Sequence, residues 1–245
     1  IERMADYPSS RQRSSWTFDK AELEEHRAIA RSRALKQHEN SEFTPSDEQK
    51  LLAHYGLKLI QLSRTLKLPD KVTSTACAYL RRFYVKKSCL EVDPQGIVLT
   101  CLYLAGKVED CYLSAERLHS VGGIPEEIIL KSELVLLQGL CFDLACHCVY
   151  KALVGGRIER GKGSDAEERV ARRKMDRLLI TDAVLLYTPG ELARYCLGHA
   201  EGTDSDEVRG GINLLHEEGF HAEKHADEQT QAIDKTLKAE RKRLK

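Results

Sequence analysis

The sequence predicts an all-α protein in which two helical units of similar plan follow one another. Apolar residues recur at intervals of three and four positions over long stretches, as they do on one face of a helix. No run of alternating β-branched residues bounded by hairpin turns indicates a strand. Two helix starts that contain proline, Asp93-Pro94 and Thr188-Pro189, lie 95 residues apart. A repeat of this length favours two similar domains over a solenoid of short repeats.

Residues 1–45 are expected to form an N-terminal segment that contains a helix. Trp16 and Phe18 are an isolated aromatic pair and cannot build a core of their own. We therefore expect them to anchor this segment on an apolar surface of the rest of the chain. Ser14 and Ser15 stand beside arginines and are candidate phosphorylation sites.

Five helices joined by short connections are predicted between residue 46 and about residue 140. The first has an N-cap candidate at Ser46, followed by acidic residues, and it stops before Pro69. Pro69 stands at the start of the second, and Pro94 opens the third, because proline costs no hydrogen bond in a first helical turn. The expected helical stretches are 46–68, 70–87, 93–110, 114–123 and 124–144.

The second unit is expected to span residues 145–245 and to repeat part of the plan of the first, residues 46–144. A shift of 95 residues places Ile97 on Leu192, Cys101 on Cys196, Leu102 on Leu197 and Ala105 on Ala200. Lys107 falls on Gly202 under the same shift, so the apolar framework is repeated without this charge. A charge that the fold does not need favours a functional role, and it favours the first unit as the working half.

Two segments of the second unit have distinctive compositions. Residues 155–169 are rich in glycine and charge and are expected to be a loop within this unit. Residues 229–245 are expected to be a charged helix.

Composition limits the kinds of partner. The chain has 245 residues with 38 basic and 38 acidic side chains, so its formal net charge is zero. This balance argues against bulk nucleic acid or an anionic membrane as the main partner. No apolar run approaches the ~20 residues needed to span a bilayer, and no signal-peptide pattern opens the sequence.

The cysteine and histidine patterns predict neither a metal site nor a catalytic centre. Most of the eight cysteines lie in apolar helical patterns, and the cluster Cys146-His147-Cys148 lacks a second pair of ligands. No nucleophile stands at motif spacing from a histidine, and no Gly-rich phosphate loop precedes a helix. We therefore expect no cofactor and no enzymatic activity. Scattered thiols fit a reducing nuclear or cytosolic compartment.

Three stretches together resemble the cyclin box: TACAYLRRFYV at 75–85, PQGIVLTCLYLAGKVED at 94–110 and LKSELVLLQGLCFDL at 130–144. Two more, SSWTF at 14–18 and ITDAVLLYTPGELA at 180–193, are similar to stretches of the cyclin H branch of that family. The resemblance covers residues 14–200 well and the last 40 residues poorly.

The resemblance implies two tandem five-helix cyclin folds with flanking N- and C-terminal helices. It also implies a regulatory subunit without catalytic activity, which binds and activates a cyclin-dependent kinase of the cyclin-dependent kinase 7 type. The implied setting is the CDK-activating kinase of transcription factor IIH (TFIIH), with a MAT1-type assembly factor and the TFIIH core as further partners. Such a protein would act in the nucleus, in transcription and in cell-cycle control.

In this family, a lysine at the end of the third box helix and a glutamate in the fifth contact the kinase. By motif match these are Lys107, in LAGKVED, and Glu133, in KSELVLL. A lysine in the last turn faces the negative end of the helix dipole and can reach carbonyl groups of a partner. The leucines around Glu133 predict a mostly buried helix. Glu109 and Asp110 are expected to be solvent-facing groups at the helix end.

Two alternatives to this function remain open at the level of sequence. One is another transcriptional cyclin, of the cyclin C type, against which LLYTPGELA argues. The other is a tandem cyclin-fold transcription factor of the TFIIB type that binds nucleic acid, against which the neutral charge argues.

The chain also departs from the pattern of cell-cycle cyclins. The stretch LLAHYGLKL at 51–59 lacks the arginine of the MRxxL motif, which puts a substrate-docking patch in doubt. Arg81 stands where many cyclins have aspartate. Arg81 and Arg82 are expected to be local ion-pair or surface groups.

Overall fold

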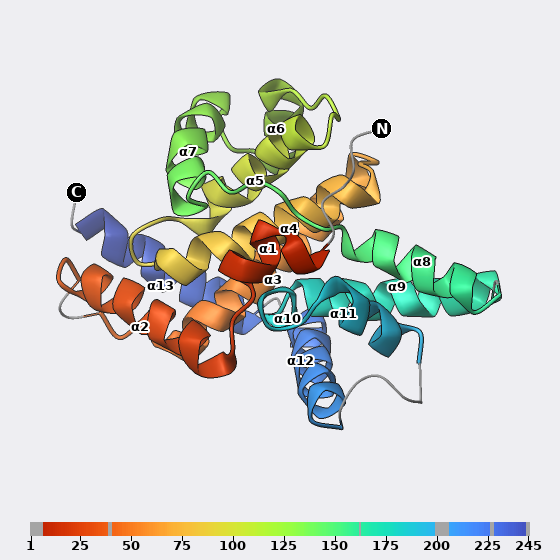
Figure 1. Ribbon diagram of the computed structural model, residues 1–245. Helices are drawn as coiled ribbons and strands as arrows, with labels where there is room; N and C mark the ends of the chain where they lie inside the picture. Colours follow the sequence, from red (N-terminus) through yellow and green to blue (C-terminus); the bar gives the residue numbers. More distant parts are fainter. Residues whose placement is uncertain (1–6, 39–40, 162, 199–205, 226–227, 244–245) are drawn as a thin grey trace.

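The computed structural model describes residues 7–38, 41–161, 163–198, 206–225 and 228–243. Ala200 and Gly202, two positions of the predicted repeat, lie outside these residues. The described part of the chain contains thirteen α-helices and one short 3-10 helix without any strand, which confirms the predicted all-α class (Figure 1).

The N-terminal segment and the first unit contain η1 (Tyr7–Ser9), α1 (Arg11–Trp16), α2 (Lys20–Leu35), α3 (Pro45–Thr65), α4 (Asp70–Lys86), α5 (Pro94–Val108), α6 (Ala115–Gly122) and α7 (Glu126–Gly139). The rest of the chain contains α8 (Val149–Glu159), α9 (Asp165–Leu179), α10 (Ala183–Leu186), α11 (Pro189–Cys196), α12 (Asp206–His225) and α13 (Glu228–Arg243).

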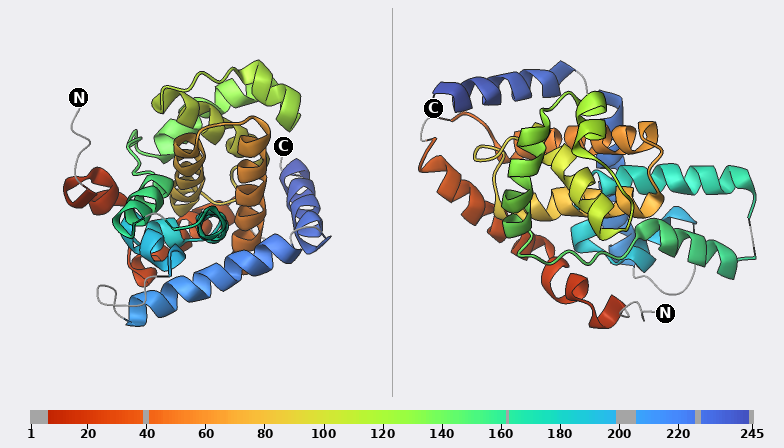
Figure 2. Two further views of the ribbon diagram at one scale, coloured as in Figure 1. Left: turned by 90° about the vertical axis from the view of Figure 1, so that its right-hand side faces the viewer. Right: turned by 90° about the horizontal axis from the view of Figure 1, so that it is seen from above.

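Helices α4 and α5 form the centre of the hydrophobic core. Helix α4 packs against α2, α3, α5, α7, α8, α9 and α10, and α5 packs against α3, α6 and α7 as well (Figure 2). Ala76, Tyr79 and Phe83 are spaced by three and four residues, so they share one face of α4, and all three are fully buried. Cys101 and Leu102 of α5 are fully buried too. The amphipathic pattern in the sequence therefore marks the residues that hold the fold together.

The first unit has the five helices predicted between residue 46 and about residue 140, but the first of them starts earlier than expected. Its N-cap is Thr44 rather than Ser46. The Thr44 hydroxyl accepts a hydrogen bond from the Asp47 N–H, and the Asp47 carboxylate accepts one from the Thr44 N–H at 3.1 Å. This reciprocal cap satisfies two N–H groups and leaves Pro45 in the first turn, where it costs nothing.

The two helix starts that contain proline are both present. Asp93 caps α5 and Thr188 caps α11, each with a proline in the first turn. Helix α4, which precedes α5, begins at Asp70, and α9, which the short α10 separates from α11, begins at Asp165, so the same shift of 95 residues relates these two helix starts as well. These positions support the division into two units, which stays a prediction.

The segment 155–169, expected to be a loop, is mostly helical. Helix α8 continues to Glu159 and α9 begins at Asp165, which leaves a short connection. Gly156 lies inside α8 because α11 passes close to it, and a Cβ atom there would lie 2.9 Å from Leu197 Cδ1. This glycine therefore serves close helix packing rather than a turn.

The charged C-terminal helix predicted at residues 229–245 is α13, which packs along α3 (Figure 2). Leu237 is its buried apolar anchor, with 1% of its surface exposed. Polar contacts fasten α13 further: the Tyr55 hydroxyl of α3 donates to Asp234 at 3.1 Å, and the Lys238 ammonium donates to the Gln95 side chain of α5 at 2.8 Å.

Candidate functional site

Lys107 stands in the last turn of α5, where the chain leaves the core. The backbone turns sharply after the helix: Asp110 has a left-handed φ of 52°, and the Cys111 N–H donates to the Gly106 carbonyl at 2.8 Å. A Cβ atom at Gly106 would lie 2.9 Å from the carbonyl oxygen of Cys111, so glycine is what lets the returning chain approach. Gly106 thus lets the chain fold back beside Lys107, which stays exposed.

Lys107 and Glu133 form an ion pair between α5 and α7. The Lys107 Nζ lies 2.7 Å from Oε1 and 2.9 Å from Oε2 of Glu133. It also lies 4.4 Å from the ring centre of Tyr103, one turn earlier on α5. The side chains of Lys107 and Glu133 are 48% and 21% exposed. The structure therefore brings together the two residues that the sequence motif singles out, on a surface that a partner can reach.

The electrostatics of this pair favour its charged form. Burial lowers the pKa of Lys107, but hydrogen bonds with Glu133 and Tyr103 outweigh that effect, and the pKa is raised above its ordinary value. The ammonium therefore keeps its three donors, and the carboxylate keeps lone pairs for further donors. Such a pair is suited to binding the carbonyl and N–H groups of a partner.

The outer face of α7 is exposed, so the expectation of a mostly buried helix is wrong for this face. Leu130 and Leu134 are 47% and 56% exposed, whereas Leu136 is fully buried. Leu130 lies one turn from Glu133 on α7, because residues three positions apart share a helix face. Leucine spacing predicts a buried helix, but α5 and α6 pack against α7 and leave this face uncovered. Exposed leucines beside an ion pair are typical of a docking surface.

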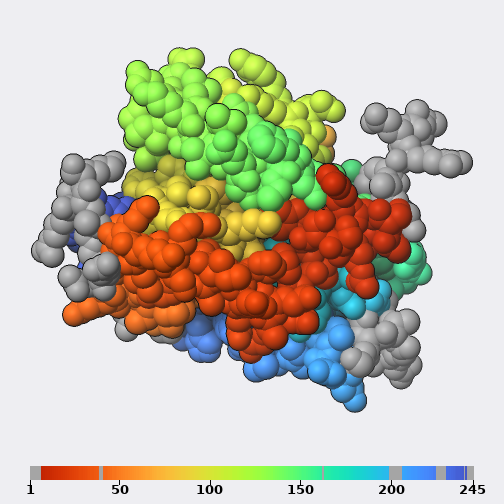
Figure 3. Space-filling model, turned by 60° about the vertical axis from the view of Figure 1, so that its left-hand side comes forward, coloured from red at the N-terminus to blue at the C-terminus, as the bar shows by residue number. Residues whose placement is uncertain are grey.

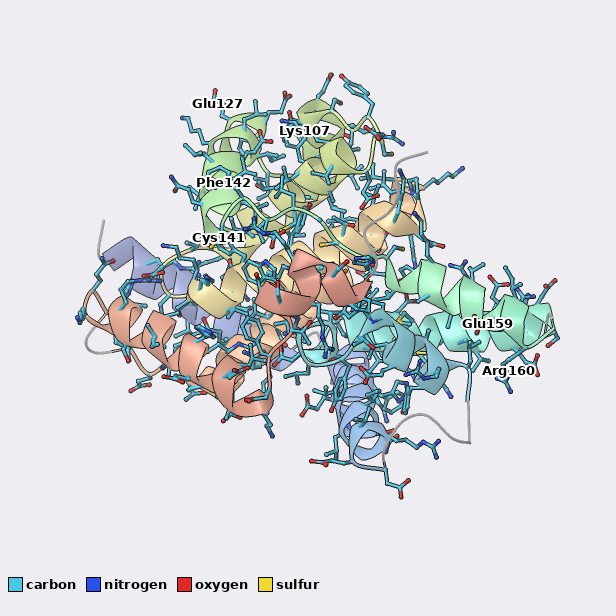
Figure 4. All side chains as sticks on the ribbon, viewed as in Figure 1. Lys107, Glu127, Cys141, Phe142, Glu159 and Arg160 are labelled. Carbon is cyan, nitrogen blue, oxygen red and sulfur yellow. The ribbon has the colours of Figure 1, made fainter. Side chains whose placement is uncertain are left out.

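The turn after α7 presents another apolar residue, Phe142, which is 62% exposed. Cys141 and Phe142 have φ values of 53° and 56°, a left-handed conformation that costs free energy for residues with a Cβ. Figure 4 shows Phe142 beside α7, in the same lobe of the molecule as Lys107. No sequence pattern marks Phe142, because the left-handed turn is occupied by two residues that are not glycine. We define the α5–α7 face as Lys107, Leu130, Glu133, Leu134 and Phe142.

Glu109 fastens the end of α5 to α4, so the expectation of a solvent-facing group is wrong for this residue. Its carboxylate accepts a hydrogen bond from the Thr75 hydroxyl at 2.7 Å and lies 3.9 Å from the Lys71 ammonium. Lys71 also donates to the Glu109 carbonyl. Asp110 is exposed, as expected. The charge cluster after Lys107 thus divides into a structural carboxylate and a solvated one.

Trp16 and Phe18 lie against the body of the protein. Trp16 is 2% exposed, its indole Nε1 donates to Asp143 Oδ2 at 3.1 Å, and the Arg82 guanidinium lies 5.2 Å from the ring centre. The Phe18 N–H donates to the Leu185 carbonyl at 2.9 Å, and its ring packs against the core. These contacts are those that an anchor of the N-terminal segment needs.

Ser14 and Ser15 are exposed on α1. Their hydroxyl oxygens lie 3.5 Å apart, and the Ser14 hydroxyl donates to the Arg11 carbonyl at 3.4 Å. Both hydroxyl groups are accessible to a modifying enzyme, and their phosphorylation stays a prediction.

Arg81 and Arg82 are buried, with 2% and 1% of their surface exposed, so the expectation of surface groups is wrong. The expected ion pair is present for Arg81, whose Nη1 lies 3.3 Å from Asp182 Oδ1. Arg82 instead donates to the main-chain carbonyls of Asp143 and Ala145, at 3.4 and 3.3 Å. Asp182 lies 101 positions along the chain from Arg81, a distance over which no sequence pattern predicts a partner.

The stretch at 51–59 that lacks the MRxxL arginine lies in α3, the helix along which α13 packs. Tyr55, in the middle of this stretch, is 2% exposed and bonded to Asp234 of α13. The C-terminal helix of the chain itself therefore occupies this side of α3.

The residues that the structure describes contain no group of three or more His, Cys, Asp or Glu side chains placed to hold a metal ion. Among the helices of the described ranges, none combines the length and the apolar character that a membrane crossing requires.

The α5–α7 face lies within the part of the chain that matches a known protein family. Residues 17–145 match the family described as "Cyclin, N-terminal domain". The chain is 29% identical over 240 residues to Cyclin-H1-1 of Arabidopsis thaliana, and the alignment covers 81% of this chain and 71% of that protein. It is 31% identical over 214 residues to Cyclin-H of Xenopus laevis, and this alignment covers 76% of this chain and 66% of that protein. The chain therefore spans about two thirds of the length of these relatives.

A solved structure is similar over most of its length. A chain of the yeast TFIIK (Kin28/Ccl1/Tfb3) complex is 25% identical and superposes with a TM-score of 0.68. The match covers 87% of this chain and 98% of that chain.

Proposed function

The chain belongs to the cyclin family, and on this basis we propose that it is the non-catalytic regulatory subunit of a CDK-activating cyclin-dependent kinase. The observation that carries the proposal is the exposed ion pair of Lys107 and Glu133, which lies within the cyclin segment. The likeness to cyclin H proteins and to a chain of the TFIIK complex supports the CDK-activating kind.

The α5–α7 face is proposed to bind the kinase next to its C-helix. The Lys107 ammonium donates to carbonyl groups at the end of a partner helix, and the Glu133 carboxylate accepts partner N–H groups. Leu130 and Phe142 add apolar surface that is removed from water on binding. A C-helix held inward completes the lysine–glutamate pair of the kinase, which phosphoryl transfer requires. The cyclin thus shifts a conformational equilibrium of its partner and supplies no catalytic group.

The proposed partners are a kinase of the cyclin-dependent kinase 7 type, a MAT1-type assembly factor and the TFIIH core. Support comes from the TFIIK structure, which contains Kin28 and Tfb3 beside Ccl1. A protein with these partners acts in the nucleus, in transcription and in cell-cycle control.

The proposal is tested by reconstitution of the chain with a purified kinase of the cyclin-dependent kinase 7 type. We expect the two proteins to co-purify and the cyclin to raise kinase activity toward a peptide of the RNA polymerase II tail. Lys107→Glu should weaken both binding and activation about tenfold or more, because a buried charge of the wrong sign is costly at an interface. Lys131→Glu is the matched control, since Lys131 stands on α7, is 81% exposed and pairs loosely with Glu127 at 3.9 Å.

A charge swap distinguishes a partner contact from an internal support. Lys107→Glu combined with Glu133→Lys restores an ion pair within the cyclin, so an internal role would be rescued. A partner contact would not be rescued, because the kinase then meets both charges in reversed positions. Wild-type binding by the single Lys107→Glu variant, or failure of the wild-type chain to recover any kinase, would contradict the proposal.

A further inference from the structure

A hollow of about 580 Å³ lies between the N-terminal segment, the start of α8 and the start of α11. Tyr7, Pro8 and Arg13 line it from the N-terminal segment, Lys151 lines it from α8, and Pro189 lines it from α11. Figure 3 shows the N-terminal segment, in red, beside green and cyan surface from later in the chain. No residue of the α5–α7 face lines the hollow, which is therefore a separate surface from the one proposed to bind the kinase.

Contacts between the N-terminal segment and the loop before α8 fix the walls of this hollow. The His147 N–H donates to the Gln12 side chain at 2.6 Å, and Gln12 is 6% exposed. The His147 ring stands edge-on to the Tyr7 ring, with the ring centres 5.2 Å apart. The Tyr7 hydroxyl is hydrogen-bonded to the Thr17 hydroxyl at 3.0 Å. The hollow is therefore preformed, which lowers the cost of binding a ligand there.

Arg13 and Lys151 give the hollow a positive charge without an internal counter-charge. None of the described residues that line it is Asp or Glu. Both cationic side chains are exposed, and in the part of the chain that the structure describes neither makes a hydrogen bond or an ion pair. Glu191, in the first turn of α11, is already bonded by the N–H and the hydroxyl of Thr188, at 2.7 and 2.8 Å. The guanidinium and the ammonium thus keep their N–H donors free for a partner.

We propose that this hollow binds an acidic segment of a partner polypeptide, in which glutamate or aspartate stands beside an apolar residue. The Arg13 guanidinium donates to one carboxylate as a planar fork, and the Lys151 ammonium donates to the same or the next one. The apolar side chain of the segment packs against Tyr7, Pro8 and Pro189. This proposal does not depend on kinase activation.

The size of the hollow and the number of its charges favour a peptide over other anions. Two cations are few beside the roughly 6–10 phosphate contacts that a nucleic-acid-binding surface makes. A volume of about 580 Å³ lies within the range of preformed binding pockets and accommodates a few side chains. A free inorganic anion would bond to the cations but would leave the apolar walls in water, whereas a peptide covers both.

The test uses the full chain and fluorescence anisotropy with two labelled peptides. One is fluorescein-Gly-Glu-Leu-Glu-Asp-Leu-Gly-amide, and the other has glutamine and asparagine in place of the glutamates and the aspartate. We expect the acidic peptide to bind about tenfold more tightly than the amide peptide. This difference should shrink when the salt concentration rises from about 0.05 to about 0.5 M, because both cations are exposed and salt screens them.

Variants at the two cations locate the binding. Arg13→Gln and Lys151→Gln should each weaken binding of the acidic peptide about three- to tenfold. Arg11→Gln is the matched control, because Arg11 is exposed on the same helix, α1, but does not line the hollow, and it should change nothing. All three side chains are exposed, so we expect each variant to keep the fold.

Every other outcome contradicts the proposal. Equal binding of the acidic peptide and its amide form, or binding of neither, would overturn it, as would equal effects of Arg13→Gln and Arg11→Gln. Unchanged affinity of Lys151→Gln, on a different helix, would overturn a site shared by the two cations. A thymidine oligonucleotide of equal charge that displaces the acidic peptide as readily as unlabelled peptide does would overturn the assignment to a polypeptide segment.

Discussion

The Trp16 indole donates from Nε1 to Asp143 Oδ2 at 3.1 Å and joins residues that lie 127 positions apart. Asp143 directly follows Phe142, so the N-terminal segment is fastened to the turn that presents part of the α5–α7 face. The ammonium of Lys86 lies 5.5 Å from the indole ring centre and strengthens the same junction. The N-terminal anchor and the proposed kinase-binding surface are therefore physically coupled.

Replacing Trp16 by a smaller residue should destabilise the protein, and two variants separate the packing of the indole from its hydrogen bond. Trp16→Ala removes a buried indole, and the free energy of unfolding should fall by about 3–5 kcal/mol. Trp16→Phe keeps most of the apolar contact but leaves the Asp143 carboxylate, 7% exposed, without its indole donor, at a cost of about 1–3 kcal/mol. Urea unfolding of the three proteins measures both steps. A Trp16→Phe protein as stable as the wild type would show that the hydrogen bond does not hold this junction.

Replacing Phe142 by glycine should separate binding from stability. Glycine adopts the left-handed φ of 56° without strain, and the lost ring is largely exposed. The free energy of unfolding should stay unchanged or rise by up to about 1 kcal/mol, whereas affinity for the kinase should fall roughly tenfold. Chemical denaturation and a kinase titration check the two effects. Loss of stability without loss of affinity would mean that Phe142 belongs to the fold and not to the docking surface.

Two glycines of the helices should respond to alanine in opposite directions. A Cβ atom at Gly139 would overlap the ring of Phe83, which is fully buried, so Gly139→Ala should lower the free energy of unfolding by about 1–3 kcal/mol. Gly155 in α8 has open space at the same position, so Gly155→Ala should raise it by about 0.5–1 kcal/mol. Thermal and urea unfolding of the two variants and the wild type measure both changes. A stabilising Gly139→Ala would contradict the close contact of α7 with α4.

Removing the Asp182 charge should change the acid sensitivity of the fold. Burial raises the pKa of Asp182, but bonds from Arg27 and Arg81 outweigh it, so the folded-state pKa lies below the ordinary value of 3.8. The carboxylate therefore contributes stability above about pH 4 that is lost as pH falls through the folded-state pKa. Asp182→Asn leaves both arginines without a counter-charge, and the free energy of unfolding at pH 7 should fall by about 3–5 kcal/mol.

The same variant should lose less stability than the wild type below pH 4, since it has no carboxylate to protonate there. Urea unfolding of both proteins at pH 7, 4 and 3 measures how steeply the free energy of unfolding depends on pH. Asp110→Asn, at an exposed position, is the control and should stay within about 0.5 kcal/mol of the wild type at each pH. If the free energy of unfolding of Asp182→Asn depended on pH as steeply as that of the wild type, the ion pair of Asp182 would not be the source of the acid sensitivity.

Local sequence signals predicted most of the helical framework. Asp93 with Pro94 and Thr188 with Pro189 marked helix starts that the structure contains, because capping depends on residues within one turn. The same signals failed where two caps competed, at Thr44 and Ser46. They also failed in segment 155–169, where Gly156, which reads as part of a loop, serves the close packing of α8 against α11.

The sequence by itself determined the helical class, the helix starts and, through its motifs, the positions of Lys107 and Glu133. Only the tertiary structure decided that these two side chains meet at 2.7 Å, that Leu130 faces outward, and that Arg81 is buried against a carboxylate 101 positions away. The physical reason is the separation along the chain over which each kind of interaction acts. A cap or an amphipathic face is settled within one or two turns of a helix. Burial and ion pairing depend on which distant surfaces pack together, and no neighbouring residue specifies them.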